Sequence, residues 1–412
     1  MEQIYKLREI EPFSVEVDNS TMIALKDLEG YKIDPVLVSP AAYSLIVLSD
    51  ESDTTTQLIR KYKDEFGFEF QEKDVKTLFE FLDNAYMLDS PKFKEYAVRV
   101  NNSFNSSRTK KAKFAGLSYP DNPRKLTAKL NTIFEEIQSV STINEADSQN
   151  ISEPQAIIVP HIDFKIGAKM MAMAWDKVRT YNYDRIVILG TGHSLLNDFY
   201  ACIDKDFETP IGTIKVDSKF LSKFEESLSE DISAQQLAYK NEHSVEFPLL
   251  FIKHLFADNR SLKIVPILLA FPENLEQEDG DASFNLKRID HFSKILKSTI
   301  ATSPGKTLIV ASIDFAHVGL RFGGNLDSLN EQNLKLIKEN DLQVIELLST
   351  WDKSKFSEHM ATTNHKYRIC GFAPLYILLS LIRSKNVKLL SYDQSIEKDT
   401  ASVVTFASLS CY

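Results

Sequence analysis

From Gln155 onward, short apolar runs alternate with segments of helical spacing such as Gly167–Val178. Strands that are apolar on both faces are typical of a mostly parallel sheet with helices packed on its two sides. The pattern therefore predicts an α/β domain. The expected strands are Ala156–Val159, Ile186–Leu189, Ile264–Leu269 and Leu308–Ala311, and the tail Ala401–Leu409 is expected to add another.

The first 97 residues follow a different pattern. Two short alternating segments flank an Asp18-Asn19-Ser20 turn and predict strands at Phe13–Val17 and Thr21–Leu25. Three helices are then expected at Pro40–Leu48 after a Ser39 cap, at Asp53–Lys63, and at Glu72–Asp83 with Val75, Leu78, Phe79 and Leu82 on one face. Strands followed by three small helices predict a winged-helix-like unit. Its acidic balance argues against reading DNA.

Polar segments suggest where the chain divides. Val100–Lys113 is rich in serine and asparagine and then basic, which is typical of a linker. A second polar stretch, Ser139–Ser152, precedes the first strong strand. We therefore expect an accessory domain over residues 1–97, a linker over 98–113 and an α/β domain over 114–412.

Composition narrows the class of protein. The 412 residues are 43% hydrophobic and 26% charged, as in a globular protein, and the formal charge of −10 argues against general nucleic-acid binding. The longest apolar stretch, Val36–Leu48, is too short to span a membrane, and the N-terminus has no apolar core that would suggest a secretory signal. Three widely spaced cysteines build no disulfide framework. We expect a reducing, cytoplasmic location.

Three of the expected strands run directly into groups that bind metals. His161 and Asp163 follow the strand Ala156–Val159, and His193 follows Ile186–Leu189. Asp314 and His317 follow the strand Leu308–Ala311. Because the carboxyl ends of parallel strands lie along one edge of a sheet, these groups are expected to meet there. The repetition is more informative than any single histidine.

Two further segments join this expectation. Cys370 directly precedes the apolar helix Ala373–Ile382, and a helix N-terminus favours the thiolate that binds metal. Glu242 and His243 precede another apolar segment, where Asn241 is expected to cap a helix whose first turn also holds Glu246.

Each feature also has a plainer interpretation. A histidine at a strand end is often a hydrogen-bonded structural residue, a lone cysteine is often a small buried side chain, and helix-terminal glutamates often only cap and solvate. Gly190-Thr191-Gly192 lacks the rest of a phosphate loop, and no nucleophile elbow surrounds the serines. The histidines and cysteines expected to serve only packing or the surface are His254, His291, His359, His365, Cys202 and Cys411.

Residues from about Ala115 to the end resemble the Memo family, in particular its bacterial and archaeal branch called AmmeMemoRadiSam system protein B. Many ordered blocks carry the resemblance. They are the segment Ala115–Pro120, PHIDFKIGA at Pro160–Ala168, ILGTGHS at Ile188–Ser194, ETPIG at Glu208–Gly212, EHSVEF at Glu242–Phe247, SIDFAHVGLRFG at Ser312–Gly323, ICGFAP at Ile369–Pro374 and SVVTFAS at Ser402–Ser408.

The resemblance implies a fold similar to that of type III extradiol dioxygenases, which hold non-haem iron with two histidines and a carboxylate. In Memo-like proteins a cysteine takes the carboxylate's place, so His161, His193 and Cys370 are the implied ligands of iron(II) or of copper. Asp314 and His317 would line the same pocket, with His317 at the position of the dioxygenase base. Glu242 and His243 would be further pocket residues.

The chain departs from those relatives at two points. A thiolate makes the site softer and open to oxidation, so ring cleavage is not inherited with the fold. PHIDF replaces the PHAGY of many Memo members and adds Asp163, which would either orient His161 or lie on the surface of the turn. The N-terminal pattern weakly resembles PqqD-like winged helices that bind peptides, and a plain accessory domain explains it equally well.

Four functions follow as hypotheses. The leading one is a metal-dependent, dioxygenase-like oxidoreductase with His317 as general acid or base. A second is a non-catalytic component that binds a peptide or partner or handles metal, since the family name implies a radical-SAM enzyme and an Ammecr-type protein as partners. Phosphopeptide binding ranks third because no arginine cluster supports it. The fourth is a hydrolase with Cys370 as nucleophile.

Overall fold

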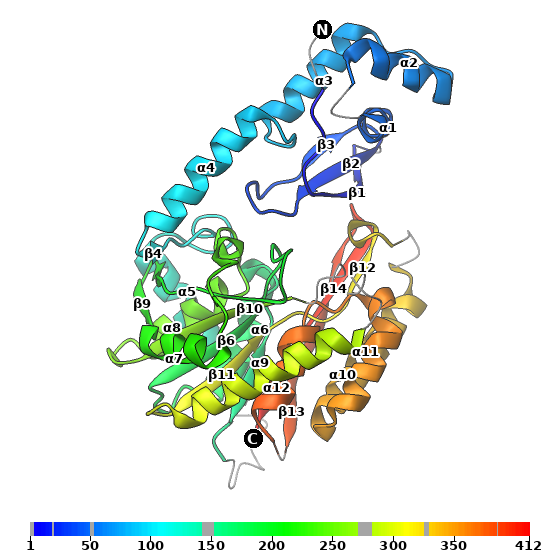
Figure 1. The fold of residues 1–412 in the computed structure, drawn as a ribbon. Helices are drawn as coiled ribbons and strands as arrows, with labels where there is room; N and C mark the ends of the chain where they lie inside the picture. Colours follow the sequence, from blue (N-terminus) through cyan, green and yellow to red (C-terminus); the bar gives the residue numbers. More distant parts are fainter. Residues whose placement is uncertain are drawn as a thin grey trace. The chain divides into compact units, whose positions relative to one another are not determined.

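The structure of the protein is a computed structural model (Figure 1). The chain forms two compact units, and most contacts lie within one unit or the other. The N-terminal unit comprises Met1–Ser106, Gly319–Leu326 and Glu397–Ser402, and the larger unit comprises Ser107–Val318, Asp327–Ile396 and Val403–Tyr412. The residues whose structure is described are 4–18, 20–49, 53–141, 152–270, 282–324, 329–384 and 386–412.

The N-terminal unit contains an antiparallel sheet in the order β1-β2-β3, formed by Ile10–Val17, Ser20–Asp27 and Val36–Val38. The expected hairpin is confirmed, because Val17 lies opposite Ser20 across the turn. The unit has its own apolar core, in which Leu25, Leu45 and Leu82 are fully buried. The finer expectation of a winged helix stays a prediction.

The helices of this unit begin where their caps dictate. α1, Pro40–Leu48, starts after Ser39, whose hydroxyl accepts a hydrogen bond from the amide of Ala42. α2, Thr55–Phe66, starts after Thr54, which forms a capping box with Gln57. This box explains why the helix begins two residues later than expected. α3, Glu72–Asn84, follows the prediction closely.

About half of the segment Val100–Lys113 is helical, although its polar composition is typical of a loop, and the boundary between the two units after Ser106 falls inside the expected linker. Residues Pro91–Ser106 form the single helix α4, visible as one long element in Figure 1, and Thr109–Lys110 form the short strand β4. Ser90 accepts a hydrogen bond from the amide of Phe93, and a proline at the first helical position suits the start of a helix. These signals, with the buried Phe93 side chain, outweigh the polar composition that follows. The boundaries at residues 97 and 114 stay predictions.

The larger unit is built on a mixed sheet with a parallel centre. Its path is β12-β14-β5-β11-β6-β10-β9-β8-β4, with β13 on β14 and β7 on β10. All four expected central strands are confirmed, and β5, β11, β6 and β10 run parallel. The strands are β5 Ala156–Val159, β6 Arg185–Thr191, β7 Tyr200–Cys202, β8 Asp206–Thr209, β9 Gly212–Val216, β10 Lys263–Leu269, β11 Thr307–Ser312, β12 His317–Gly319, β13 Val387–Glu397 and β14 Ser402–Cys411.

Two groups of helices cover this sheet. One group joins α5, α6 and α8, and the other joins α7, α9 and α12, with α11 and α10 following on α12. Every residue of β6 is buried, as expected for a strand between two helical layers. The helices are α5 Pro123–Ser141, α6 Phe164–Asp176, α7 Ser218–Leu228, α8 Glu246–Leu255, α9 Ala282–Thr302, α10 Glu331–Thr350, α11 Lys353–Tyr367 and α12 Phe372–Leu381, with a short 3₁₀ turn at Gln236–Tyr239. A second 3₁₀ turn, Leu320–Phe322, belongs to the N-terminal unit.

Two observations complete the description. The polar stretch expected from Ser139 begins inside α5, and its residues 142–151 lie outside the described part of the chain. Among the described residues, none of the helices is both long enough and apolar enough to cross a membrane.

The sheet register brings the strand ends together. Ser312, the last residue of β11, pairs with Val159 of β5 and with Gly190 of β6. His161, His193 and Asp314 follow within two or three residues of these paired positions. The carboxyl ends of three adjacent parallel strands therefore deliver these side chains to one edge of the sheet.

Candidate metal centre

His161 is the buried centre of the cluster. Its Nδ1 lies 3.0 Å from the carbonyl oxygen of Ser312, which only accepts hydrogen bonds, so Nδ1 carries the hydrogen. The other ring nitrogen, Nε2, lies 3.6 Å from the Sγ of Cys370 and 3.7 Å from an oxygen of Asp314. In the neutral ring Nε2 thus offers its lone pair towards the thiol.

His193 is held from behind by Glu242. Both oxygens of this buried carboxylate lie 3.1 Å from the Nδ1 of His193, and one also accepts the His193 amide at 2.9 Å. Glu242 further accepts the amide of Ser244 and lies 3.5 Å from the Nδ1 of His243. Burial raises the pKa of Glu242, but the two histidines and the amide outweigh it and hold that pKa well below its usual range.

Three imidazoles meet at this edge. The rings of His193 and His243 stack with centroids 4.8 Å apart, and His161 meets both edge-on at 5.1 and 5.2 Å. Each ring offers one nitrogen, and these three nitrogens lie within 4.8 Å of one another. The three residues form a candidate metal site. Sequence reasoning placed His243 at the pocket but not among the ligands.

Cys370 completes the cluster directly before α12. Burial alone raises the pKa of its thiol, but His161 and His193 favour the thiolate and lower that pKa to about 7. Gly371 allows this close approach, because an added Cβ would lie 2.8 Å from the Cβ of Ile313. The expected thiolate character of Cys370 therefore comes from the neighbouring imidazoles. β11 and α12 hold the side chain in place.

The charges of the two central histidines respond to the same neighbours. Burial lowers the pKa of His161, while Asp314 and Cys370 raise it, and the net direction is upward. For His193, burial also lowers the pKa, but Glu242 and Cys370 raise it to about 10. The metal-free cluster therefore favours a thiolate beside imidazolium groups.

Asp314 and His317 both follow β11 but differ in burial and in their hydrogen-bond partners. Asp314 is buried, and one of its oxygens accepts the amides of His161 and Ile162, so it fixes the turn after β5. Burial raises its pKa against the influence of His161. His317 begins β12 with its Nδ1 3.0 Å from the carbonyl oxygen of Phe315.

A buried network behind this strand end was missed by sequence reasoning. Thr405 in β14 exchanges hydrogen bonds with the backbone of Phe315 and Ala316, and its hydroxyl also accepts the Ala316 amide at 2.7 Å. The same hydroxyl donates to Asp341 of α10 at 2.6 Å, as does the hydroxyl of Tyr392 at 2.8 Å. No local signal in the sequence marks Asp341, because only tertiary packing brings α10 behind the strand end.

One local expectation needs correction, and the structure favours one of the two alternatives for Asp163. Asn241 does not cap a helix, because α8 begins at Glu246 after Val245 and has no side-chain cap. Glu242 accepts the Ser244 amide in the preceding turn instead, so its carboxylate closes that turn. Asp163 caps α6 through the amide of Lys165, and the Ser312 carbonyl orients the His161 ring.

The remaining histidines and cysteines whose side chains the structure describes agree with their expected packing or surface roles. His254 stacks on Phe134, His359 lies 3.1 Å from Asn340, and His291 is exposed. Cys202 and Cys411 are buried free thiols, and burial raises the pKa of each. The side chain of His365 lies outside the described part of the structure.

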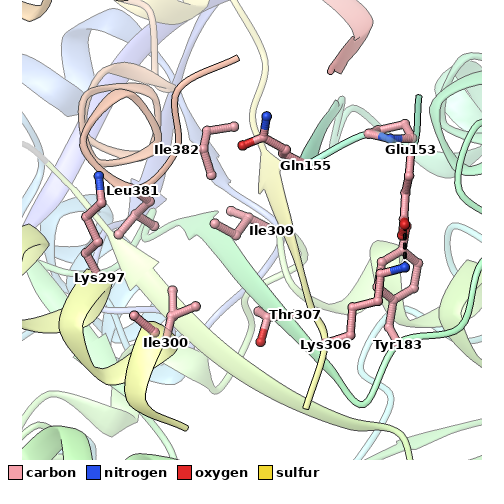
Figure 2. A pocket seen from close by; sticks show the side chains of 12 residues that line it. Glu153, Gln155, Tyr183, Lys297, Ile300, Lys306, Thr307, Ile309, Leu381 and Ile382 are labelled. Atoms are coloured by element: carbon pink, nitrogen blue, oxygen red, sulfur yellow. Dashed lines mark hydrogen bonds and ion pairs between the residues drawn. The ribbon is translucent and has the colours of Figure 1, made fainter. Parts of the chain in front are cut away.

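A separate cavity of about 360 Å³ opens at the opposite edge of the sheet, beside the first residues of β5 and β11. Figure 2 shows apolar side chains such as Ile309 and Leu381 between two lysines. Lys306 is paired with Glu153, and Lys297 donates to the carbonyl of Ser380. These pairings leave the cavity without a cluster of reactive groups like that around His161.

The larger unit matches a known family over almost its whole length. The family described as "Memo-like protein" matches residues 110–410. The chain belongs to the Memo family. Every member of the candidate cluster lies inside the matched region, so the resemblance noted from the sequence blocks is confirmed.

Relatives in the Memo family come from distant organisms. A MEMO1 family protein of Aquifex aeolicus is 26% identical over 382 residues, covering 92% of this chain and 93% of the relative. One from Thermus thermophilus is 25% identical and covers 82% and 92%, and one from Pyrococcus furiosus is 30% identical and covers 73% and 98%. The Aquifex alignment therefore extends well before residue 110.

Proposed function

We propose that this Memo-family protein binds a redox-active metal ion, iron(II) or copper, and uses it in a dioxygenase-like oxidoreductase reaction. The ligands we assign are His161, His193 and Cys370, with His243 as a fourth donor. The carrying observation is how the rings are held. The Nδ1 atoms of His161 and His193 face the Ser312 carbonyl and the Glu242 carboxylate, which directs the opposite nitrogens into the cluster.

The donor set fits such an ion. Histidines that bind a metal through one ring nitrogen almost always donate a hydrogen bond from the other nitrogen to a carbonyl or carboxylate. The rings of His161 and His193 are placed in this way. A thiolate beside imidazoles suits copper(I) or iron(II) better than magnesium or calcium. When bound, such an ion supplies electron transfer and Lewis-acid polarisation.

The chain's own groups supply proton transfer and positioning. We assign His317 as general acid or base, because the Phe315 carbonyl orients its ring through Nδ1 and it follows the same strand as Asp314. A positioned base typically contributes about 10²–10⁴-fold to a rate. Asp314 holds the backbone at His161, and Glu242 holds two imidazoles, so both act as positioning groups in this proposal.

Metal content after anaerobic purification tests the proposal. We expect near-stoichiometric iron or copper in the wild type and strong loss in His161→Ala, His193→Ala and Cys370→Ser. His291→Ala is the matched control, because it removes an exposed histidine elsewhere. His317→Ala should keep the metal. A wild type that takes up neither metal after reconstitution, or a control that loses as much metal as the site variants, would overturn the assignment.

One observation favours a second candidate, a thiol-dependent hydrolase. The Sγ of Cys370 lies 3.6 Å from the Nε2 of His161, and its lowered pKa suits a nucleophile. Alkylation by iodoacetamide distinguishes the two functions. Protection of Cys370 by added iron(II) or copper supports the metal site, whereas fast alkylation that metal does not slow supports the nucleophile.

The partners remain expectations. A radical-SAM enzyme and an Ammecr-type protein are the partners that the family name implies, and a peptide is the ligand expected at the N-terminal unit. A non-catalytic, metal-handling role would use the same cluster. Pulldown with the full-length protein tests these expectations, and recovery of neither protein from the native cell would contradict them.

A further inference from the structure

Glu246, the first residue of α8, is almost completely buried, and four hydrogen-bond donors surround its carboxylate. One oxygen accepts from the Lys110 ammonium and the Lys113 amide, both at 2.9 Å. The other accepts from the Phe114 amide at 2.7 Å and the Tyr119 hydroxyl at 2.6 Å. All four donors come from residues 110–119, which we call the strap.

The strap also reaches two segments that carry histidines of the cluster. The hydroxyl of Ser118 donates to Asp163 at 2.7 Å, two residues after His161. The ring of Phe114 meets the ring of His243 edge-on, with centroids 5.6 Å apart. One short segment therefore connects the turn after β5 with the turn before α8.

Aromatic rings surround the imidazole of His243 on several sides. Its ring stacks on His193 at 4.8 Å, and Phe114 and Phe247 meet it at 5.6 and 5.4 Å. Its distance to Glu242, 3.5 Å, is longer than the 3.1 Å by which His193 is held. Phe114 and Phe247 therefore help to fix the orientation of the His243 ring.

We propose that Glu246 is a positioning residue of the metal centre. By saturating its carboxylate with donors from the strap, it holds Phe114 against His243 and so keeps that imidazole in place as the fourth metal donor. This inference rests on the proposed metal-binding function. Glu246 and Phe114 thus act on the metal site indirectly, through the position of His243, and neither touches the metal.

Cobalt(II) titration of the metal-stripped, full-length protein tests the inference. Its absorption spectrum reports the thiolate and the number of donors separately. We expect Phe114→Ala and Glu246→Gln to weaken cobalt binding by about tenfold or more, as supporting groups of metal ligands typically do. Both should change the visible bands in the same way as His243→Ala while keeping the thiolate band.

A matched control and a double variant isolate the effect from general loss of stability. Asp217 also forms a buried ion pair, with Arg185 at the start of β6, far along the strand from the cluster, so Asp217→Asn should leave the cobalt affinity and spectrum unchanged. If Phe114 acts through His243, the double variant of both should bind cobalt no more weakly than His243→Ala alone.

The outcomes separate the inference from the proposed function. A wild type that binds no cobalt removes both. A wild type that binds, with unchanged affinity and spectrum in Phe114→Ala and Glu246→Gln, overturns only the inference. Additive losses in the double variant also overturn it. If Glu246→Gln does not fold, Phe114→Ala decides, because the half-buried Phe114 leaves no buried charge behind.

Discussion

Asp341 offers a sharp test of the network behind the candidate metal centre. It is fully buried in α10, and one of its oxygens accepts from Thr405 and Tyr392, while the other has no hydrogen-bond partner among the described residues. Thr405 in turn holds the backbone between Asp314 and His317. Replacing the carboxyl group by an amide, Asp341→Asn, keeps the shape and removes the titration.

The magnitude follows from the pKa. Burial raises the pKa of Asp341 from 3.8 to about 7, although its hydroxyl neighbours lower it. A difference of about 3 pKa units corresponds to about 4 kcal/mol. Because the folded state binds the proton more tightly, this contribution is complete below about pH 3.8, declines as the pH rises, and is lost above about pH 7.

Urea unfolding followed by tryptophan fluorescence measures the effect. Both tryptophans, Trp175 and Trp351, lie in the larger unit with Asp341, so they report on the relevant unfolding. The free energy of unfolding of the wild type relative to Asp341→Asn should fall by about 3 kcal/mol between about pH 5 and about pH 8. Tyr392→Phe removes a hydroxyl that favours the charged form and should move this decline to higher pH.

A pH-independent difference would refute the reasoning. If the free energies of unfolding of wild type and Asp341→Asn differ by the same amount across this range, within about 0.5 kcal/mol, the carboxyl group has no raised pKa. A difference that grows in the opposite direction would mean that the folded state stabilises the carboxylate.

Three further predictions concern the groups around the cluster. Glu242→Gln removes the charge beside the imidazole of His193, which we propose as a metal ligand. This change should weaken metal affinity about 10- to 100-fold, measured by competition with a chelator, and an unchanged affinity would argue against the supporting role of Glu242. Gly371→Ala places a Cβ 2.8 Å from that of Ile313 and should destabilise by about 1–3 kcal/mol in urea unfolding, and an unaffected midpoint would show that the contact relaxes freely. Lys110→Met leaves the Glu246 carboxylate buried without its cation and should cost about 3–5 kcal/mol, seen as a lower thermal midpoint; equal midpoints would contradict the pairing.

Local patterns predicted most of the secondary structure. The central strands are uniformly apolar, and burial between two helical layers requires that composition, so β5, β6, β10 and β11 were predictable from four short runs. The α4 helix was not, because serine and asparagine are typical of loops, and only the cap at Ser90 and the packing of Phe93 favour a helix there.

The strand-end argument predicted where the cluster lies. His161, His193 and Asp314 each follow a parallel strand, and the register then brings them together. The same argument could not assign His243 to the ligand group, because it lies in a turn before α8 rather than at a strand end. Its nearness to the other imidazoles depends on how that turn packs.

The sequence by itself determined the alternation of strands and helices, the family and the residue types of the site, because each is written in local periodicity or in short ordered blocks. Tertiary structure alone decided which nitrogens face the cluster, that Glu242 holds two imidazoles, and that Glu246 and Asp341 are buried behind the site. Apart from the pairing of Glu242 with the neighbouring His243, these facts depend on contacts between residues about 50 to 150 positions apart, and no local pattern specifies which distant carbonyl, carboxylate or hydroxyl a buried side chain will meet.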